Sequence, residues 1–213
     1  MARIASGEWA IEEGAKIIRN GGVVIYPTDT VYGLGCDPFR PEAVERIFRI
    51  KGERAKPVPI LIDNPERLRG LVELNEAAEG LMRRFWPGPL TLVLRNVGFP
   101  PEVTRGGSTV GVRIPNNSIA LSLISKSGGF LVGTSANRTG CPPCLTAEEA
   151  LERLGDEVDL IIDGGRAELA IGSTVVDVSS GEPRLLRPGP LDWGSIGAAI
   201  RPSRSADRVD EPA

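Results

Sequence analysis

Residues 23–35 read VVIYPTDTVYGLG, and this run joins an apolar strand to a dense group of polar side chains. The β-branched start at Val23 predicts a buried strand, which Pro27 ends. Two threonines, an aspartate, a tyrosine and two glycines then follow within one short turn. Loops held by a rigid scaffold often carry binding groups. We therefore expect this turn to line a functional site, the alternative being a polar strand-to-loop junction with no further role.

Two later segments repeat the combination of an apolar strand with small hydroxyl residues. They read GTSAN at residues 133–137 and GSTVVD at residues 172–177. Three such junctions in one chain predict a single composite pocket.

The composition is that of an ordinary globular protein, and it excludes several kinds of site. The 213 residues carry a net charge of −3, which argues against a generally basic nucleic-acid binder but leaves a local basic face open. Histidine is absent, so Ser-His-Asp and Cys-His catalysis and histidine metal sites are excluded. No apolar run approaches the length of a membrane span and no signal peptide is recognisable, so we expect a soluble, cytoplasmic protein.

Helical and strand patterns are mixed along the whole chain. Helices are predicted to begin near residues 6, 41, 65, 75, 117 and 146. Strands are predicted at residues 23–26, 58–62, 90–94, 109–114, 130–133, 160–162, 174–178 and 184–186, the last two as a hairpin. This mixture predicts an α/β fold, a single domain over residues 1–200 in which helices flank a twisted mixed sheet. Residues 201–213 are polar and predict a disordered tail.

Basic residues lie where predicted elements end. Lys51 and Arg54 follow the second helix, where they could clamp a phosphate or only complement the helix dipole. Arg113 alternates with two valines in the run TVGVRIP, so it points off the sheet. There it could grip a carboxylate or phosphate with two prongs, and an exposed face is the alternative. Arg187 ends a further strand in the run LLRPG.

Ser135 and Asn137 add hydroxyl and amide groups at the end of another strand. Together with the four cations, they suit a polyanionic ligand with a sugar or amino-acid part. Neither a GxxxxGKS/T loop nor a GxGxxG run is present, so the common nucleotide-binding folds are not expected.

The three cysteines do not predict a functional site. Cys141 and Cys144 have the CxxC spacing, but no helix opens behind a strand there, as it would in a thioredoxin-like motif. With Cys36 they leave a zinc site one ligand short, because histidine is absent. We expect a loop, which a disulfide could close, and no metal site.

The segments PTDTVYGLG, TVGVRIP, GTSAN, GSTVVD and LLRPG occur in this order, and together they resemble the YrdC-type threonylcarbamoyl-AMP synthase family. The similarity covers about residues 14–189. It implies a YrdC/RibB-like fold and a nucleotidyltransferase that makes threonylcarbamoyl-AMP and pyrophosphate from L-threonine, bicarbonate and ATP. The product would serve the N6-threonylcarbamoyladenosine modification of tRNA. Longer relatives carry an extra C-terminal domain, and we expect this chain to be the short form without it.

The resemblance also implies roles for individual residues. The threonine would be bound by Thr30, Arg113 and Ser173, with Arg113 holding its carboxylate. The ATP side would be lined by Lys51, Arg54, Thr109, Ser135, Asn137 and Arg187. Lys51 and Arg54 would be catalytic because they neutralise the phosphates. The family's Lys-x-Arg reads Lys51-Gly-Glu-Arg54 here, with the arginine one place late.

The same resemblance implies that Mg²⁺ arrives with ATP and has no fixed protein site. The product would pass to downstream tRNA threonylcarbamoyl-transfer machinery. Two other interpretations stay open. Members of this fold are also linked to double-stranded RNA, so an RNA-binding or ribosome-assembly module is one, although the acidic balance weighs against it as the main role. A carbamoyl-transfer domain, as in hydrogenase maturation, is the other.

Overall fold

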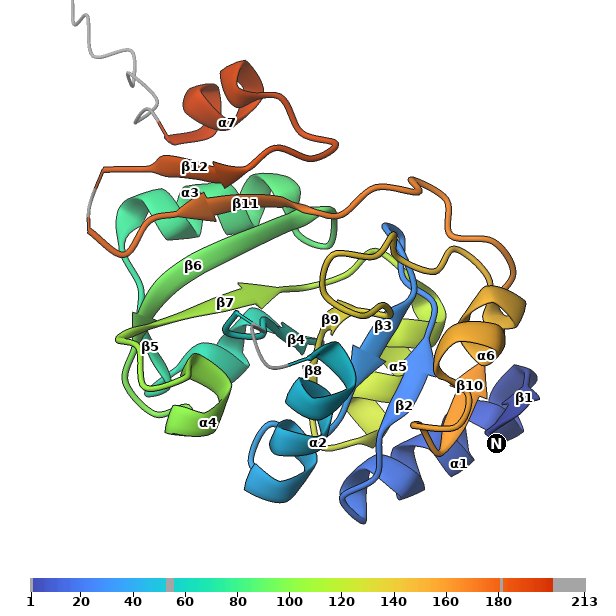
Figure 1. Cartoon of the computed structure of the whole chain (residues 1–213). Helices are drawn as coiled ribbons and strands as arrows, with labels where there is room; N and C mark the ends of the chain where they lie inside the picture. Colours follow the sequence, from blue (N-terminus) through green and yellow to red (C-terminus); the bar gives the residue numbers. More distant parts are fainter. Residues whose placement is uncertain (1, 53–55, 181, 201–213) are drawn as a thin grey trace, which may run out of the picture.

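The computed structural model describes residues 2–52, 56–180 and 182–200, and its strands form two mixed sheets (Figure 1). The first holds, in spatial order, β1 (Arg3–Ala5), β10 (Leu160–Ile162), β2 (Val24–Tyr26), β3 (Gly33–Gly35) and β9 (Thr134–Ser135). The second holds β12 (Arg184–Arg187), β11 (Thr174–Asp177), β6 (Leu90–Asn96), β7 (Thr109–Arg113), β4 (Ile60–Ile62) and β8 (Phe130–Val132), with β5 (Val72–Glu73) paired to β6. The predicted α/β class and mixed strand directions are confirmed, and the strands divide between two sheets.

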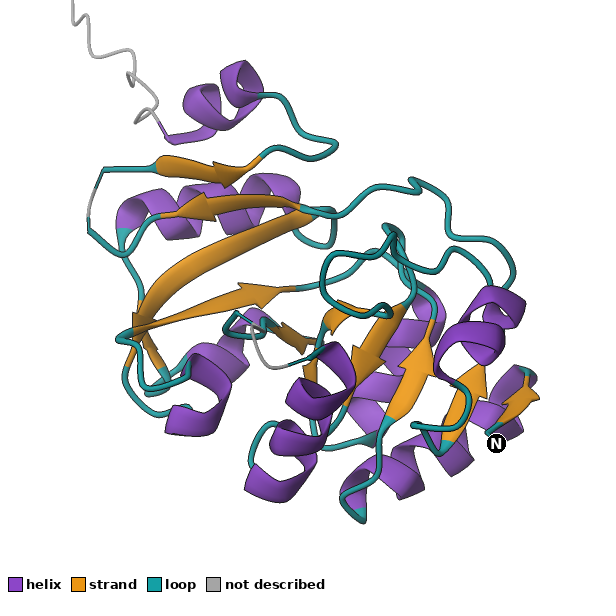
Figure 2. Cartoon of the chain, in the orientation of Figure 1, coloured by secondary structure: helices purple, strands orange, loops and turns teal. Residues whose placement is uncertain are grey.

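Helices cover both sides of the first sheet (Figure 2). On one side lie α1 (Gly7–Arg19) and α5 (Ser118–Lys126), and on the other α2 (Pro41–Lys51) and α6 (Ala147–Leu154). The side chains of β2 alternate between the two layers. Val24 and Tyr26 pack with α1 and α5, whereas Val23 and Ile25 belong to the larger core on the opposite side. This strand is therefore buried on both faces, as its continuous apolar run predicts.

The second sheet is covered by α3 (Glu76–Phe85), which packs against α7 (Trp193–Ile200). Leu92 of β6, Val112 of β7 and Val176 of β11 lie in the same core as Leu81 of α3. The alternate residues of β6 and β7 point to the opposite face. Short helical turns complete the fold: η1 (Pro65–Leu68) and α4 (Pro101–Thr104).

Most predicted helix starts are confirmed by their side-chain caps. Asn75 accepts a hydrogen bond from Ala78 N (2.9 Å), and Asn117 accepts one from Ala120 N (3.0 Å). Thr146 accepts one from Glu149 N at 3.3 Å, and the Glu149 carboxylate accepts from Leu145 N, one residue earlier than in a standard capping box. Ser6 precedes α1, but its side chain makes no capping hydrogen bond, so that cap prediction is wrong.

The glycines of the opening run belong to a strand, whereas the sequence places them in a turn. Gly33 pairs with Tyr26, and Gly35 pairs with Val24, across antiparallel β2 and β3. The Tyr26 ring explains the glycines, because a Cβ added at Gly33 would lie 2.7 Å from it. The Tyr26 hydroxyl donates to Val132 O of β8 at 3.0 Å. Tyrosine and glycine together therefore bring the two sheets into contact.

Several short elements were not predicted, namely β1, β5, β9, α4 and α7. The strands among them are two or three residues long, and α4 has four residues. Such segments are too short to show a hydrophobic period. The predicted tail at residues 201–213 lies outside the described residues. Among the helices that are described, none is long and apolar enough to cross a membrane.

We expect Gly35→Ala to lower the free energy of unfolding by about 1–3 kcal/mol, because overpacking strains a close-packed core. The added methyl carbon would lie 2.5 Å from the Val132 carbonyl oxygen, which belongs to the neighbouring backbone. Urea denaturation measures the change. Gly197→Ala is the control: nothing lies within 4 Å of its new methyl group, and alanine favours a helix. Equal unfolding free energies for Gly35→Ala and the unchanged protein would contradict this packing.

Candidate functional site

The turn at residues 27–32 is held rigid by its own hydroxyl groups. Thr28 Oγ1 accepts hydrogen bonds from Thr30 N (3.1 Å) and Val31 N (3.3 Å), and it donates to Val31 O at 2.7 Å. Thr30 Oγ1 lies 2.9 Å from Thr28 Oγ1. Thr28, Asp29 and Thr30 are all buried. The polar groups of this turn are therefore fixed in place by the fold.

Arg113 reaches this turn from the end of β7. Its guanidinium group donates from Nε to Gly88 O at 2.9 Å, from Nη1 to Thr30 Oγ1 at 2.9 Å and from Nη2 to Asp29 Oδ1. Only 6% of the Arg113 side chain and 4% of the Asp29 side chain are exposed. Burial lowers the pKa of Arg113, and the charge of Asp29 opposes that change. The alternation with valines is confirmed, but the exposed face that it allowed is wrong, because the turn covers the arginine.

A second group of predicted residues meets at the end of α2. Lys51 Nζ donates to Ser135 O (2.7 Å) and to Asn137 Oδ1 (2.8 Å), and Ser135 Oγ donates to the same amide oxygen at 2.6 Å. Burial lowers the pKa of Lys51 to about 8. The helix-dipole alternative does not explain these contacts, which run from a buried amine to another strand. Arg54 lies outside the described residues.

A third group joins Ser173 to Arg187. The Arg187 guanidinium group donates to Ser173 O from Nε (3.1 Å) and Nη2 (2.8 Å), and Nη2 also lies 3.1 Å from Ser173 Oγ. Thr91 Oγ1 of β6 lies 2.8 Å from Ser173 Oγ. The positive charge of Arg187 contributes to the lowered pKa of Arg113, so the Arg113 and Arg187 groups lie in one neighbourhood.

Thr109 is set apart from these groups. It begins β7, whereas Arg113 ends it. Four residues of strand separate the two positions by about 13 Å. The structure therefore brings together seven of the nine predicted site residues in three groups: Thr30 with Arg113, Lys51 with Ser135 and Asn137, and Ser173 with Arg187. Thr109 lies at the opposite end of its strand from Arg113, and Arg54 lies outside the described residues.

Backbone contacts place the groups side by side around β3. Gly33 pairs with Ser135, and Tyr32 O accepts a hydrogen bond from Ala136 N at 2.8 Å. The Tyr32 hydroxyl donates to Gly165 O at 2.7 Å, and burial raises its pKa to about 12. The turn after β2, the GTSAN segment and the loop that precedes β11 therefore adjoin one another (Figure 1).

The CxxC segment forms a loop, as predicted, and both of its cysteines are free thiols. The disulfide that the sequence allowed is therefore not formed. Cys144 is buried, which raises its pKa, whereas Cys141 is exposed. The Cys141 carbonyl accepts a hydrogen bond from Asn137 Nδ2, and Thr139 N donates to Lys51 O at 2.9 Å. This loop thus braces the lysine and the asparagine.

Sequence analysis missed three contributors to the site. Asp29 was noted as a carboxylate within the turn, but no role was assigned to it. The sequence does contain a signal for a role of Asp29, because a carboxylate that becomes buried in such a turn needs a cationic partner. Gly88 lies within the run WPGP at residues 86–89 and Thr91 follows it. Nothing in their pattern distinguishes them from ordinary turn and strand residues.

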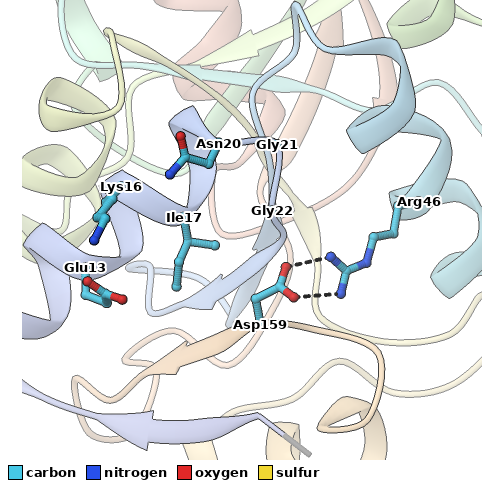
Figure 3. Close-up of a pocket in the computed structure, with 8 residues that line it drawn as sticks. All are labelled: Glu13, Lys16, Ile17, Asn20, Gly21, Gly22, Arg46 and Asp159. Carbon is cyan, nitrogen blue, oxygen red and sulfur yellow. Dashed lines mark hydrogen bonds and ion pairs between the residues drawn. The ribbon is translucent and has the colours of Figure 1, made fainter.

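A separate hollow lies away from these residues, at the C-terminal end of α1 (Figure 3). Arg46 and Asp159 form a two-bonded ion pair there, at 2.6 and 3.1 Å, and Asp159 also accepts from Val23 N at 2.7 Å. These contacts tie α2 to the start of β2 and β10. None of the predicted site residues lines this hollow, so we assign it a structural role.

The described residues contain no cluster of metal-binding side chains. Within residues 2–52, 56–180 and 182–200, no group of three or more His, Cys, Asp or Glu side chains is placed to hold a metal ion. Of the three groups of site residues, only the one around Arg113 contains a carboxylate, and Asp29 is paired with that arginine.

The depressed pKa of Lys51 predicts a pH-dependent stability. The folded value of about 8 lies below the ordinary 10.5, so the unfolded chain binds more protons between these values. The free energy of unfolding, measured against Lys51→Met, should therefore rise between pH 8 and pH 10.5. Denaturation of both proteins at several pH values tests this. Lys16→Met is the control for the loss of a lysine, because Lys16 of α1 is exposed. A difference that stays flat across this range would contradict the burial of the charge.

Comparison with known proteins identifies the family. Residues 16–189 match the Sua5/YciO/YrdC model, whose description is telomere recombination. A threonylcarbamoyl-AMP synthase of Pyrococcus abyssi is 45% identical over 91% of this chain, which spans 58% of that protein. One of Nitrosococcus oceani is 37% identical over 84% of this chain and 98% of that protein. The crystal structure of P. abyssi Sua5 complexed with L-threonine has a TM-score of 0.90 at 42% identity, covering 93% of this chain and 61% of that one. The chain belongs to the Sua5/YciO/YrdC family.

Proposed function

We propose that this chain is a threonylcarbamoyl-AMP synthase, which converts L-threonine, bicarbonate and ATP into threonylcarbamoyl-AMP and pyrophosphate. The observation that carries the proposal is the buried Arg113, held against Thr30 in a fold whose P. abyssi relative is complexed with L-threonine. An arginine at this depth, beside two further groups with cationic side chains, suits a site for anionic substrates.

Arg113 retains the capacity to bind a carboxylate. A guanidinium group has five N–H donors, and contacts to Gly88, Thr30 and Asp29 occupy three of them. Two donors are left for the carboxylate of threonine. The same contacts fix the plane of the guanidinium group, so the substrate would be oriented as well as bound.

The other two groups suit the ATP side. Charged Lys51, held by Ser135 and Asn137, would neutralise phosphate oxygens, and Arg187 would contact the nucleotide from β12. Transfer at phosphorus depends mainly on positioning and charge neutralisation, and therefore needs no histidine. Mg²⁺ would supply further charge neutralisation when it is bound with ATP. Among the described residues, the three groups contain one carboxylate, Asp29, and it is paired with Arg113. This donor set suits an ion brought by the nucleotide.

The reaction balances with these components. The threonine amine and bicarbonate combine to a carbamate with loss of water. A carbamate oxygen then attacks the α-phosphorus of ATP, and pyrophosphate leaves. The product is a reactive mixed anhydride, which the tRNA threonylcarbamoyl-transfer machinery would consume in the cytoplasm. RNA binding by this chain itself stays a prediction.

The reaction provides a direct test. Purified protein should release pyrophosphate from ATP only when threonine and bicarbonate are both present, and mass spectrometry should identify threonylcarbamoyl-AMP. Omitting each substrate in turn gives the controls. Pyrophosphate release that does not depend on threonine would refute the proposal.

Arg113→Lys should raise the threonine concentration needed for half-maximal activity by about 10- to 100-fold, since charge-assisted hydrogen bonds contribute roughly 1.5–3 kcal/mol. Lysine keeps the charge but cannot make the three separate contacts of the guanidinium group. Arg95→Lys is the matched control, because Arg95 is exposed and its ion-pair partner is Glu73 at 3.5 Å. If Arg113→Lys keeps the threonine dependence of the unchanged protein, Arg113 does not bind the carboxylate.

A further inference from the structure

The two carboxylate oxygens of Asp29 have different surroundings. Oδ1 accepts hydrogen bonds from Arg113 Nη2 and from Asn116 N at 3.2 Å. Oδ2 is enclosed and has no hydrogen-bond partner among the residues that the structure describes. A buried carboxylate oxygen without a donor is costly, so such an atom needs a physical reason.

Stability of the turn does not supply that reason. The hydroxyl groups of Thr28 and Thr30 already satisfy one another and the backbone, and Oδ1 alone makes the ion pair with Arg113. The orphaned oxygen instead lies in the group that we assign to the amino acid. Oδ2 belongs to the same carboxylate whose Oδ1 touches Arg113. An acceptor without a partner therefore lies next to a guanidinium group with two unused N–H donors.

This pairing complements an amino acid in its zwitterionic form. An α-amino acid carries an ammonium group and a carboxylate on the same carbon atom, so the two opposite charges are close neighbours. Arg113 and Asp29 present the reverse charges at an equally short separation, because their side chains are in contact. We propose that Asp29 Oδ2 binds the α-ammonium group of threonine while Arg113 binds its carboxylate, an inference that rests on the proposed synthase function.

Other acceptors around the turn are already engaged. The Gly88 carbonyl accepts from Arg113, and Thr30 Oγ1 also accepts from Arg113. Asp163 Oδ1 accepts from Gly165 N at 2.8 Å, and its side chain is only partly buried, so solvent can satisfy its other oxygen. An ammonium group placed at Asp29 would have its nitrogen fixed relative to the bound carboxylate. Once the ammonium group has lost a proton to solvent, the same nitrogen would be held as a free amine in an orientation from which it can combine with bicarbonate, with loss of water, to give the carbamate.

The enclosure of Oδ2 has a consequence for binding. The Asp29 carbonyl accepts a hydrogen bond from Leu169 N at 3.0 Å, so the segment that precedes β11 lies against this residue. Leu169 itself is 39% exposed and sits at the surface of that segment. An ammonium group would reach Oδ2 only if neighbours of Asp29 moved, and this segment is one of them because it is hydrogen-bonded to the Asp29 backbone.

The test compares two ligands on the full chain by titration calorimetry. One is L-threonine, and the other is the 2,3-dihydroxybutanoate of the same configuration, in which a hydroxyl replaces the amine. The unchanged protein should prefer threonine by about 10- to 100-fold. Asp29→Asn should remove most of that preference by weakening threonine much more than the hydroxy acid. A role of Asp29 limited to positioning Arg113 would weaken both ligands equally and would overturn the inference.

Three controls complete the experiment. Asp29→Glu keeps the charge and should recover part of the preference for threonine. Asp177→Asn should leave the preference unchanged, because the Asp177 carboxylate accepts a hydrogen bond from Ser179 N and belongs to none of the three groups. If Asp29→Asn does not fold, the affinities of the unchanged protein for the two ligands still test the inference. Equal affinity for threonine and the hydroxy acid would overturn it. Binding of neither ligand by the unchanged protein would refute the synthase proposal itself. Threonine binding with the preference intact in folded Asp29→Asn would refute only the role of Asp29.

Discussion

The buried ion pair between Arg113 and Asp29 is the contact on which the site depends. Each partner is almost completely withdrawn from solvent, and taking two charges out of water costs about as much as their attraction returns. Such a pair is weak evidence for stability on its own account. Its value here is positional, because Arg113 belongs to the second sheet and Asp29 to the turn that leaves the first.

The packing of Tyr26 on glycine makes that positional contact possible. The tyrosine ring occupies the space that side chains at Gly33 and Gly35 would fill, and its hydroxyl donates to β8 in the other sheet. Val132 N of β8 in turn donates to Cys36 O at 2.9 Å. The two sheets are thus joined on either side of the turn, and the turn has little freedom to move away from Arg113.

The fold was predictable from sequence wherever a pattern was long enough to be periodic. The alternation in TVGVRIP correctly assigned Val110 and Val112 to the core and Arg113 to the opposite face. It could not show that Arg113 is buried, because the cover comes from a turn 84 residues earlier in the chain. The sequence predicts Gly33 and Gly35 as turn residues, but they belong to β3. Glycine is needed there because the Tyr26 ring on the adjacent strand fills the side-chain space. The resemblance assigned Lys51, Ser135 and Asn137 to the same side of the site, but it did not predict their hydrogen bonds to one another. No local pattern links residues so far apart in the chain.

The distribution of the site along the chain has a consequence for its assembly during synthesis. Its first contributor lies in the turn after β2 and its last, Arg187, ends β12. A nascent chain that has completed the first three strands contains the threonine hydroxyls but lacks both arginines and the lysine's partners. The parallel pairing of β10 with β2 and of β11 with β6 likewise waits for late segments, and such non-local pairings form slowly. The three groups of site residues can therefore come together only after β12 has been synthesised, and a shorter nascent chain holds an incomplete site.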